Sequence, residues 1–425
     1  MFDSKIILPD GYALNQIIDR SAIRFDQDMI CCQSMIRENL FMCLECGKIF
    51  AGGTAGSPLL LHYGRVAHTI ALNLKTNKVV MLPNYQELPD YKEISDIQFA
   101  SRPIYTDKVI NLILQKQKEG IKINNKLFYP GQLLFDLRSK QSSQLSVIRF
   151  ISRITPLRDF LLLNPQSTPL ASEFSRYFKQ AFNPYGFRDH ISPFNLLRSI
   201  QTLSNDKYNV QNEVNPAEYF TFILQLLNQE IPGKIVSKLI CGKLNLVEDN
   251  NGDCNFTSKV INYWSIPLEP YECPLYRNGL EKEKIIPQAT LESLMERYNG
   301  TQITVKSIGN RQIVQRKMSI NKSSEFLWIN VNRIRPASFG LEKLNLHIVH
   351  SDDGSIDLSK YGVNAKYDLV SVISHEGEVN SGLYVNYCKN EAGVWLKCGN
   401  SDVSNSMFQV AATSQCCHLL YQRRK

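Results

Sequence analysis

The pattern of apolar and polar positions changes character along the chain. Residues 142–154 and 216–230 repeat their apolar positions at helical spacing, and the second segment opens with Pro-Ala-Glu, a favourable first turn. After about residue 233 the pattern is that of strands. The segments that predict strands are 233–247, 258–269, 325–334, 367–377, 382–389, 393–399 and 416–424. Helices followed by strands predict an α+β fold, with helices packed against a large, mostly antiparallel sheet.

The N-terminal part has a different pattern. Residues 1–22 predict an irregular N-terminal segment. Residues 23–105 are dense in Cys, His, Gly and short apolar runs, which is typical of a small domain stabilised by a bound metal ion. Residues 68–83 alternate apolar positions on both sides of a Thr-Asn-Lys turn, which predicts a hairpin. Residues 106–120 predict a helix with an Asp/Thr start and a Gly stop. This helix would form a linker over 106–124 before a second domain over 125–425.

Composition and charge narrow the class of protein only a little. The 425 residues include 43% hydrophobic and 21% charged positions, which is ordinary for a folded globular protein. The net charge of +8 includes no dense basic block beyond the terminal Arg423, Arg424 and Lys425. Such a surface is compatible with work near RNA, but it is more typical of a solvated face.

Targeting signals and cysteine usage indicate the compartment. No apolar run approaches the roughly 18 residues that a membrane span needs, and the N-terminus does not have the pattern of a signal peptide. We therefore expect the 11 cysteines to be reduced, in the cytosol or the nucleus.

Two acidic loops resemble calcium sites. The segment at 248–255 has Cys254 where a calcium loop needs glycine, and it lacks the closing glutamate. The segment at 350–357 offers no ligand pattern beyond a turn. Both loops are predicted to be hairpin tips rather than metal sites.

The strongest chemical signal is a CxxC knuckle, Cys43 and Cys46, followed by His62 and His68. Two thiolates and two imidazoles form a common tetrahedral set for structural zinc. The spacing of the histidines suits a short helix carrying His62, with Ser57-Pro58 at its start and a stop at Gly64, and then a strand from His68. The alternative is a buried cysteine pair with two unrelated surface histidines.

These residues also carry a resemblance to a known family. Residues 29–50 and 57–83, which hold the CxxC knuckle and both histidines, resemble the ubiquitin-hydrolase-type zinc finger of the spliceosomal ubiquitin-specific-protease homologues. That family is catalytically inactive and acts with the tri-snRNP. Residues 129–162, 263–300 and 367–404 are similar, in the same order, to the cysteine box, middle segment and histidine box of its protease-like domain.

The resemblance implies a papain-like second domain, with a helical thumb and a large antiparallel sheet, whose catalytic positions are vacated. The nucleophile position falls on or near Ser142, the general base on Leu383, and the orienting acid on Gly399 or Asn400. A thiol protease needs a thiolate beside an imidazole held by a third group. His375 is expected at the far end of the hairpin, too distant to substitute.

The resemblance further implies one structural zinc ion, held by Cys43, Cys46, His62 and His68. Active relatives often hold another zinc through two CxxC pairs in the finger region, where this chain has only the single residues Cys241, Cys254 and Cys273. We expect no metal there. In the N-terminal module Cys31 is present, but Ser34 and Pro58 stand where its partners would be. Whether Cys31 or Cys32 joins a second metal site stays open.

The function that the resemblance implies is that of a nuclear pre-mRNA splicing factor. It would be a non-catalytic scaffold for tri-snRNP assembly or its entry into the spliceosome, with snRNP proteins and perhaps snRNA as partners. No membrane partner and no small-molecule substrate are expected. The alternatives are a ubiquitin reader that uses Phe41 and Lys48, an active deubiquitinase with relocated residues, and an unrelated α+β protein with a chance zinc knuckle.

Overall fold

The computed structural model describes most of the chain. The described residues are 11–26, 28–123, 126–131, 134–135, 141–186, 190–249, 256–270, 288–308, 312–337, 340–379, 381–399, 402–411 and 415–424. The chain divides into two compact units, one of residues 1–136 with 176–193 and the other of residues 137–175 with 194–425. No helix among the described residues is long and apolar enough to cross a membrane. The domain boundaries given above stay predictions.

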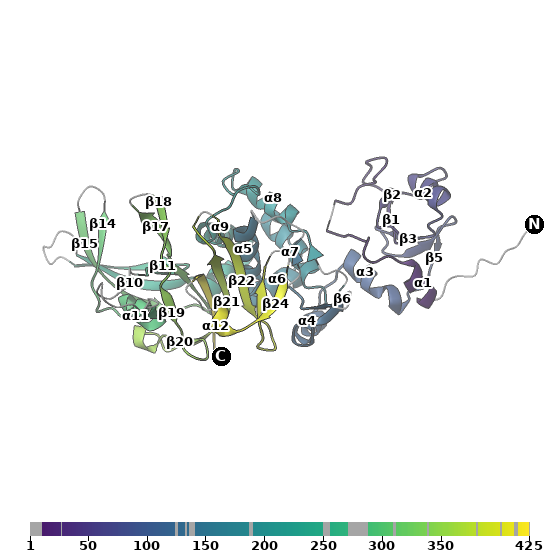
Figure 1. The fold of residues 1–425 in the computed structure, drawn as a ribbon. Coiled ribbons are helices and arrows are strands. Elements are labelled where there is room, and N and C mark those ends of the chain that lie inside the picture. The colour runs from purple at the N-terminus through teal and green to yellow at the C-terminus, as the bar shows by residue number, and fades with distance from the viewer. Residues whose placement is uncertain are drawn as a thin grey trace, which may run out of the picture. The chain divides into compact units, whose positions relative to one another are not determined.

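A five-stranded antiparallel sheet in the order β2-β1-β3-β4-β5 is the centre of the first unit (Figure 1). Its strands are β1 (Leu40–Cys43), β2 (Ile49–Ala51), β3 (Ile70–Asn73), β4 (Val79–Met81) and β5 (Gln86–Glu87). Alternate residues of β1 enter different apolar clusters, Leu40 and Met42 on one side and Phe41 and Cys43 on the other. The sheet is therefore buried on both faces. The predicted hairpin is confirmed as the β3–β4 pair.

Helices complete the first unit. They are α1 (Gly11–Ile17), α2 (Pro58–Val66), α3 (Ser95–Ser101) and α4 (Asp107–Glu119), and the short strands β6 (Ile121–Ile123), β7 (Lys126–Phe128), β8 (Leu134–Phe135) and β9 (His190–Ile191) follow. The predicted helix at 106–120 is confirmed, with Thr106 before its first residue and Gly120 (φ 78°) after its last. The predicted irregular N-terminal segment over 1–22 is wrong for α1, because Leu14 is fully buried in the core and stabilises a helix there.

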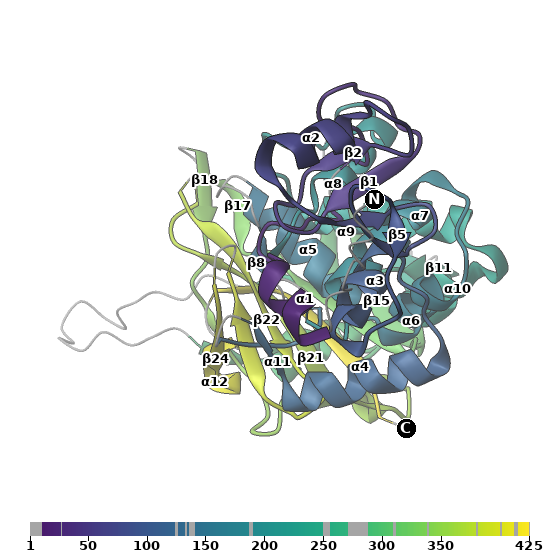
Figure 2. The same cartoon turned by 90° about the vertical axis from the view of Figure 1, so that its right-hand side faces the viewer.

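Helices also form the first part of the second unit. These are α5 (Ser142–Ser152), α6 (Thr155–Leu163), α7 (Pro169–Ala181, which crosses the unit boundary), α8 (Phe194–Leu203), α9 (Pro216–Glu230) and α10 (Ile235–Ile240). Every residue of α5 is buried, because it contacts α6, α9 and the strands β21 and β22 (Figures 1 and 2). Phe150 of α5 packs against Phe220 of α9, which in turn packs against Trp328 of the sheet. The predicted helices at 142–154 and 216–230 are confirmed.

Two sheets contain most of the strands of the second unit. An eight-stranded sheet has the order β12-β16-β25-β21-β22-β23-β24, with β20 also paired to β21, and a four-stranded sheet has the order β11-β10-β15-β14. Only the β12–β16 pair is parallel within the larger sheet. The α+β class with a large, mostly antiparallel sheet is confirmed. The strands are β10 (Gly242–Asp249), β11 (Phe256–Tyr263), β12 (Ile266–Leu268), β14 (Thr304–Ile308), β15 (Gln312–Lys322), β16 (Phe326–Val331), β20 (Ser355–Asp357), β21 (Lys366–Glu376), β22 (Leu383–Lys389), β23 (Trp395–Cys398), β24 (Val403–Ser406) and β25 (Cys416–Arg423).

The remaining elements are short. They are β13 (Gln288–Thr290) with its parallel partner β19 (His347–Val349), β17 (Ile334–Ala337) with β18 (Gly340–Lys343), and the helices α11 (Leu291–Met295) and α12 (Phe408–Ala411). One strand prediction is wrong in part, since residues 235–240 of the predicted strand 233–247 form α10. Val236 and Ile240 of that helix are buried, and an apolar run of this length suits either structure until its neighbours are known.

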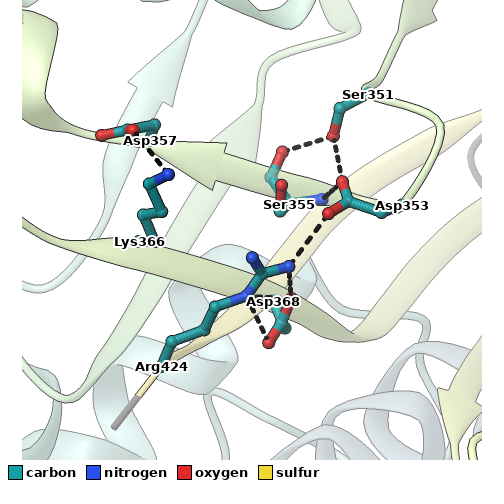
Figure 3. Close-up of polar contacts among 7 residues, drawn as sticks. All are labelled: Ser351, Asp353, Ser355, Asp357, Lys366, Asp368 and Arg424. Carbon is teal, nitrogen blue, oxygen red and sulfur yellow. Dashed lines mark hydrogen bonds and ion pairs between the residues drawn. The ribbon is translucent and has the colours of Figure 1, made fainter.

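The loop at 350–357 is not a hairpin tip, because β19 and β20 pair with different strands. Its carboxylate Asp353 accepts hydrogen bonds from Ser351 and from the backbone of Ser355, and it pairs with Arg424 at 2.9 Å (Figure 3). Asp368 pairs with the same guanidinium at 2.6 Å. The guanidinium of Arg424 therefore lies between the carboxylates of Asp353 and Asp368, where a calcium ion would have to bind. The other loop, 248–255, lies largely outside the described residues.

Burial in the eight-stranded sheet produces a pH dependence of stability. Burial lowers the pKa of His418 to about 3, against an ordinary value of 6.5. The unfolded chain therefore binds a proton at this position below about pH 6.5 and the folded chain does not. We expect the free energy of unfolding to fall between about pH 6.5 and 4, by up to about 1.4 kcal/mol per pH unit for this histidine. Urea titrations across this range measure the slope.

The variant His418→Gln provides the comparison, because glutamine keeps a polar side chain and does not titrate. The variant should show a smaller slope of unfolding free energy against pH, whatever its stability at pH 7. Equal slopes in the two proteins would show that His418 is protonated as readily in the folded chain as in the unfolded one.

Candidate metal centre and candidate active site

The four predicted metal ligands come together in the first unit. Cys43 ends β1, Cys46 lies in the following turn, His62 lies on α2, and His68 precedes β3. Their ligand atoms all lie within 4.8 Å of one another. The Sγ atom of Cys43 is 3.4 Å from Nδ1 of His68, and the Sγ atom of Cys46 is 3.5 Å from Nε2 of His62. The four donor atoms therefore surround one point.

This geometry fits a tetrahedral zinc ion. Bonds of about 2.3 Å to sulfur and about 2.0 Å to nitrogen, at tetrahedral angles, place a sulfur and a nitrogen ligand about 3.5 Å apart. The observed sulfur–nitrogen separations of 3.4 and 3.5 Å agree with that value. Two thiolates and two imidazoles fill all four positions of the ion. The ion would hold the fold together and would offer no open position for chemistry.

Local sequence explains how the ligands are positioned. Gly47 has a φ of +69°, and a Cβ there would lie 1.9 Å from the carbonyl oxygen of Ala22, so the knuckle needs glycine at this position. The carboxylate of Glu45 accepts hydrogen bonds from the backbone N–H groups of Thr69 and Ile70, which fixes the segment after His68.

Electrostatics at the cluster favour neutral ligands until a cation binds. Burial raises the pKa of the Cys43 thiol. Burial also lowers the pKa of the His62 imidazole, and the neighbouring His68 lowers it further. Zinc binding therefore requires the thiols to release protons, which couples metal affinity to pH.

Two details of α2 differ from the prediction. Ser57 precedes the helix, but its hydroxyl hydrogen-bonds the hydroxyl of Tyr85 at 3.1 Å and does not cap the first turn. The helix also continues past Gly64 to Val66, and it ends because Ala67 adopts a left-handed conformation with φ 55°. The helix still carries His62 as predicted.

The other residues singled out in this unit lie outside the four-residue metal cluster. Cys31 is fully buried, and its Sγ accepts a hydrogen bond from the backbone N–H of Ser34. Phe41, which the ubiquitin-reader alternative would use, is only 6% exposed and packs against Tyr85 in the core. Lys48 is exposed. The aromatic half of the proposed ubiquitin-binding pair is therefore unavailable to a ligand.

The candidate active site lies in the second unit, where α5 begins. Ser142 is the first residue of α5 and is 1% exposed. Its Oγ accepts a hydrogen bond from the backbone N–H of Tyr384 at 3.0 Å and donates one to Oε1 of Glu213 at 3.2 Å. Burial raises the pKa of Glu213, and the hydrogen bond from Ser142 lowers it in part. The hydroxyl at the expected nucleophile position thus connects a helix, a strand and a loop.

Leu383, which the resemblance places at the base position, carries no acid–base group. Leu383 is the first residue of β22, is 44% exposed and pairs across the strands with Glu376. That carboxylate accepts a hydrogen bond from the hydroxyl of Tyr387 at 2.6 Å and pairs with Lys397 at 2.9 Å. The charges of Glu376 and Lys397 therefore neutralise each other.

His375 does not lie at the far end of the hairpin, and that expectation is wrong. It pairs directly with Tyr384, because the connection between β21 and β22 spans only residues 377–382. Its ring packs 4.7 Å from the ring of Tyr384, and a Cβ at Gly382 would lie 2.4 Å from the imidazole. Burial, aided by Lys343, lowers the pKa of His375 to about 4. The imidazole is neutral and enclosed at pH 7.

Gly399, one of the two residues expected at the acid position, is hydrogen-bonded to a residue of α5. The carbonyl oxygens of Cys398 and Gly399 accept hydrogen bonds from Nη1 of Arg149, at 2.8 and 2.7 Å. The carboxylate of Asp402 lies where a side chain at Gly399 would extend, since a Cβ there would be 2.3 Å from its Oδ1. Asn400, the other candidate for this position, lies outside the described residues.

Sequence reasoning missed Glu213 and Arg149. Neither belongs to a motif, and their partners are 71 and 250 residues away in the chain. Of the three cysteines considered for a second zinc site, Cys241 is half-buried with a thiol pKa raised by burial. Cys254 and Cys273 lie outside the described residues.

Comparisons with known proteins agree with this architecture. The model of the family described as "Ubiquitin carboxyl-terminal hydrolase" matches residues 144–421. The model described as "Zn-finger in ubiquitin-hydrolases and other protein" matches residues 31–93, which contain the whole metal cluster. The predicted cofactor, one structural zinc ion, is confirmed: the zinc-finger model matches this region, and the four residues can bind one metal ion.

Curated relatives are similar over most of their length. Mouse "Ubiquitin carboxyl-terminal hydrolase 39" is 24% identical, covering 96% of this chain and 79% of that protein. "Probable mRNA-splicing protein ubp10" from Schizosaccharomyces pombe is 23% identical, covering 84% of this chain and 77% of that protein. "Pre-mRNA-splicing factor SAD1" from Saccharomyces cerevisiae is 25% identical, covering 68% and 65%.

Solved structures share the fold. One described as "Crystal structure of an essential yeast splicing factor" superposes with a TM-score of 0.76 at 18% identity, covering 97% of this chain and all of that chain. A chain in "Structure of the SAGA Ubp8/Sgf11/Sus1/Sgf73 DUB module bound to ubiquitin aldehyde" superposes with a TM-score of 0.53 at 16% identity, covering 97% of this chain and 93% of that chain. At these identities the likeness concerns the fold alone.

The metal cluster leads to a direct prediction. The purified chain should contain one zinc ion, and Cys46→Ser or His68→Ala should reduce the zinc content to near zero because each removes one of four ligands. Elemental analysis measures the metal, and hydrogen exchange reports the loss of order in β1 to β3. Cys32→Ser, which changes an exposed cysteine outside the cluster, serves as the control. Full zinc content in both ligand variants would contradict the assignment.

The hydrogen bonds of Ser142 lead to a second prediction. Ser142→Ala should lower the free energy of unfolding by about 1–3 kcal/mol, because the partly buried N–H of Tyr384 and carboxyl of Glu213 lose their partner. Ser152→Ala is the matched control, since this buried serine of the same helix donates only a local bond to the carbonyl of Arg149. Denaturant unfolding of both variants measures the difference. A Ser142→Ala loss no larger than that of the control would contradict a linking role.

Proposed function

The chain belongs to the ubiquitin carboxyl-terminal hydrolase family, and we propose that it is a non-catalytic member that acts as a pre-mRNA splicing factor in the nucleus. It would serve as a scaffold that supports assembly of the tri-snRNP or its entry into the spliceosome. Its partners would be snRNP proteins and perhaps snRNA. The division into a zinc finger over 23–105, a linker over 106–124 and an inactive protease-like domain over 125–425 is part of this proposal.

The observation that carries the non-catalytic part is the environment of Ser142. A hydroxyl becomes a useful nucleophile only when a positioned base takes its proton, and the substrate must also reach it. Here the hydroxyl accepts a backbone N–H, donates to Glu213 and is 1% exposed. The residue expected as base is Leu383. Losing the members of a catalytic triad costs on the order of 10⁴ to 10⁶ in turnover.

Neither His375 nor Cys417 takes the place of the expected catalytic base and nucleophile. His375 is neutral, and its ring packs against Tyr384. Cys417 in β25 is the nearby thiol, and burial raises its pKa to about 11, so it is not a thiolate at pH 7. Its Sγ donates a hydrogen bond to the carbonyl of Gln415. A thiolate–imidazole pair is therefore not assembled from these residues.

Glu213 supports a second candidate function, a hydrolase in which this carboxylate acts as the base for Ser142. The hydrogen bond between them and the raised pKa of the carboxyl favour it. The burial of Ser142 weighs against it, since a carbonyl carbon must approach Oγ to react. The ubiquitin-reader alternative loses support from the burial of Phe41.

The splicing part of the proposal is supported by the relatives. Two of them, from different yeasts, carry names that state a role in splicing, and each match covers about two thirds or more of both proteins. The segments that resemble the family's zinc finger, cysteine box, middle segment and histidine box occur in the same order along the chain. A scaffold role uses the shape of both units and requires no turnover.

Catalysis is tested with a ubiquitin C-terminal fluorogenic substrate. The wild-type chain should show no turnover above the uncatalysed rate, and Ser142→Cys should show none either, because a thiol without an imidazole partner at Leu383 stays protonated. Turnover by the wild type that disappears in Glu213→Gln would instead establish the second candidate. The ubiquitin-reader alternative is tested by titrating labelled ubiquitin into the wild type.

Splicing is tested by purification of the tagged protein from its own cells at low salt, followed by sequencing of the bound RNA and mass spectrometry of the bound proteins. The spliceosomal small nuclear RNAs and snRNP proteins should be enriched. Low salt is needed because weak phosphate contacts are lost steeply as ionic strength rises. The absence of both classes, from cells in which the tagged chain replaces the native one, would contradict the proposal.

A further inference from the structure

The second unit contains a basic cavity that the proposed function does not use. It has a volume of about 810 Å³ and lies where α10, β10, β11, β15 and β25 meet. Its charged lining residues are five bases and one acid. These residues are Lys234, Lys238, Lys243, Lys322, Arg423 and Glu325. Cations from four separate stretches of the chain thus converge on one recess.

These cations have no acidic partners. Across the described part of the chain, none of the five bases forms an ion pair. The guanidinium of Arg423 donates only to the carbonyl oxygen of Asn364, at 3.4 Å. Its neighbour Arg424 is different, since Asp353 and Asp368 both pair with it (Figure 3). The positive charge of the cavity is therefore available to a ligand.

Strand pairing brings two of these cations directly together. The register of β10 with β15 places Lys243 opposite Lys322, next to an irregularity in the pairing. Like charges directly opposite each other on neighbouring antiparallel strands destabilise a sheet. An anion between the two ammonium groups would remove this repulsion and would be bound by both.

We propose that this cavity binds a compact ligand that carries several phosphate groups. A volume of about 810 Å³ is in the range of small-ligand pockets. Several cations around one point suit several phosphates on a small framework, whereas an RNA strand is bound along a basic stripe with aromatic rings that stack on its bases. The described lining has no aromatic side chain. This inference does not depend on the role in splicing.

Isothermal titration of the full chain with inositol hexakisphosphate tests the proposal. The wild type should bind this probe, with an affinity that falls as salt is raised. The double variant Lys243→Gln/Lys322→Gln should bind at least about tenfold more weakly, since it removes two charge-assisted hydrogen-bond donors. Lys75→Gln/Lys317→Gln is the matched control, because it also removes two positive charges and both lysines lie outside the cavity lining. The control variant should bind like the wild type.

Two further arms identify the source of the phosphates. Vesicles that contain phosphatidylinositol bisphosphate test a lipid headgroup, and a single-stranded RNA oligonucleotide tests a nucleic acid. Binding of the soluble probe or of the vesicles, weakened by the double variant and not by the control, supports the proposal. Absent binding, equal weakening in both variants, or a preference for RNA over the soluble probe would overturn it. Thermal unfolding confirms that the lysine variants are folded.

Discussion

The second unit depends on the burial of one helix, α5. It is buried along its whole length, and its two ends hold different segments of the large sheet in place. Ser142 at its start binds the backbone at Tyr384, and Arg149 one turn before its end binds the carbonyl oxygens of Cys398 and Gly399. The resemblance to the protease family placed the nucleophile on Ser142 and the acid on Gly399. In this structure both residues take part in hydrogen bonds that connect α5 to the sheet.

Under the proposed non-catalytic role, a buried polar contact of this kind stabilises the fold without taking part in catalysis. A hydroxyl with two partners stabilises its surroundings, while leaving either partner unpaired in the interior is costly. The zinc cluster acts in the same way in the first unit, because it closes the CxxC knuckle, α2 and β3 around one ion and leaves no open position. Under the proposed function, each unit offers its shape to partners, and the polar groups described here stabilise that shape.

Much of the fold and the metal cluster could be predicted from the sequence. The features that could not be predicted have physical causes. The helix at 216–230 and the hairpin after His68 follow from local periodicity and turn residues, and the metal ligands follow from their spacing. The segment 235–240 could not be assigned, because a short apolar run fits a buried strand or a buried helix. The position of His375 depended on where the turn begins. The connection begins at residue 377, directly after β21, and this places His375 beside Tyr384 and not at the far end of the hairpin. Glu213 and Arg149 act through contacts between distant segments, for which a single sequence carries no local signal.

The reactivity of a thiol placed at the start of α5 tests the central claim most directly. The rate of alkylation of Ser142→Cys by iodoacetamide, measured against pH in a background where the exposed Cys32 is replaced, gives the pKa of that thiol. With no imidazole to stabilise a thiolate, and with Glu213 beside it, the account predicts slow alkylation and a pKa above the ordinary value of about 8.5. A pKa below about 7 would reveal a cationic partner beside that thiol and would contradict the account.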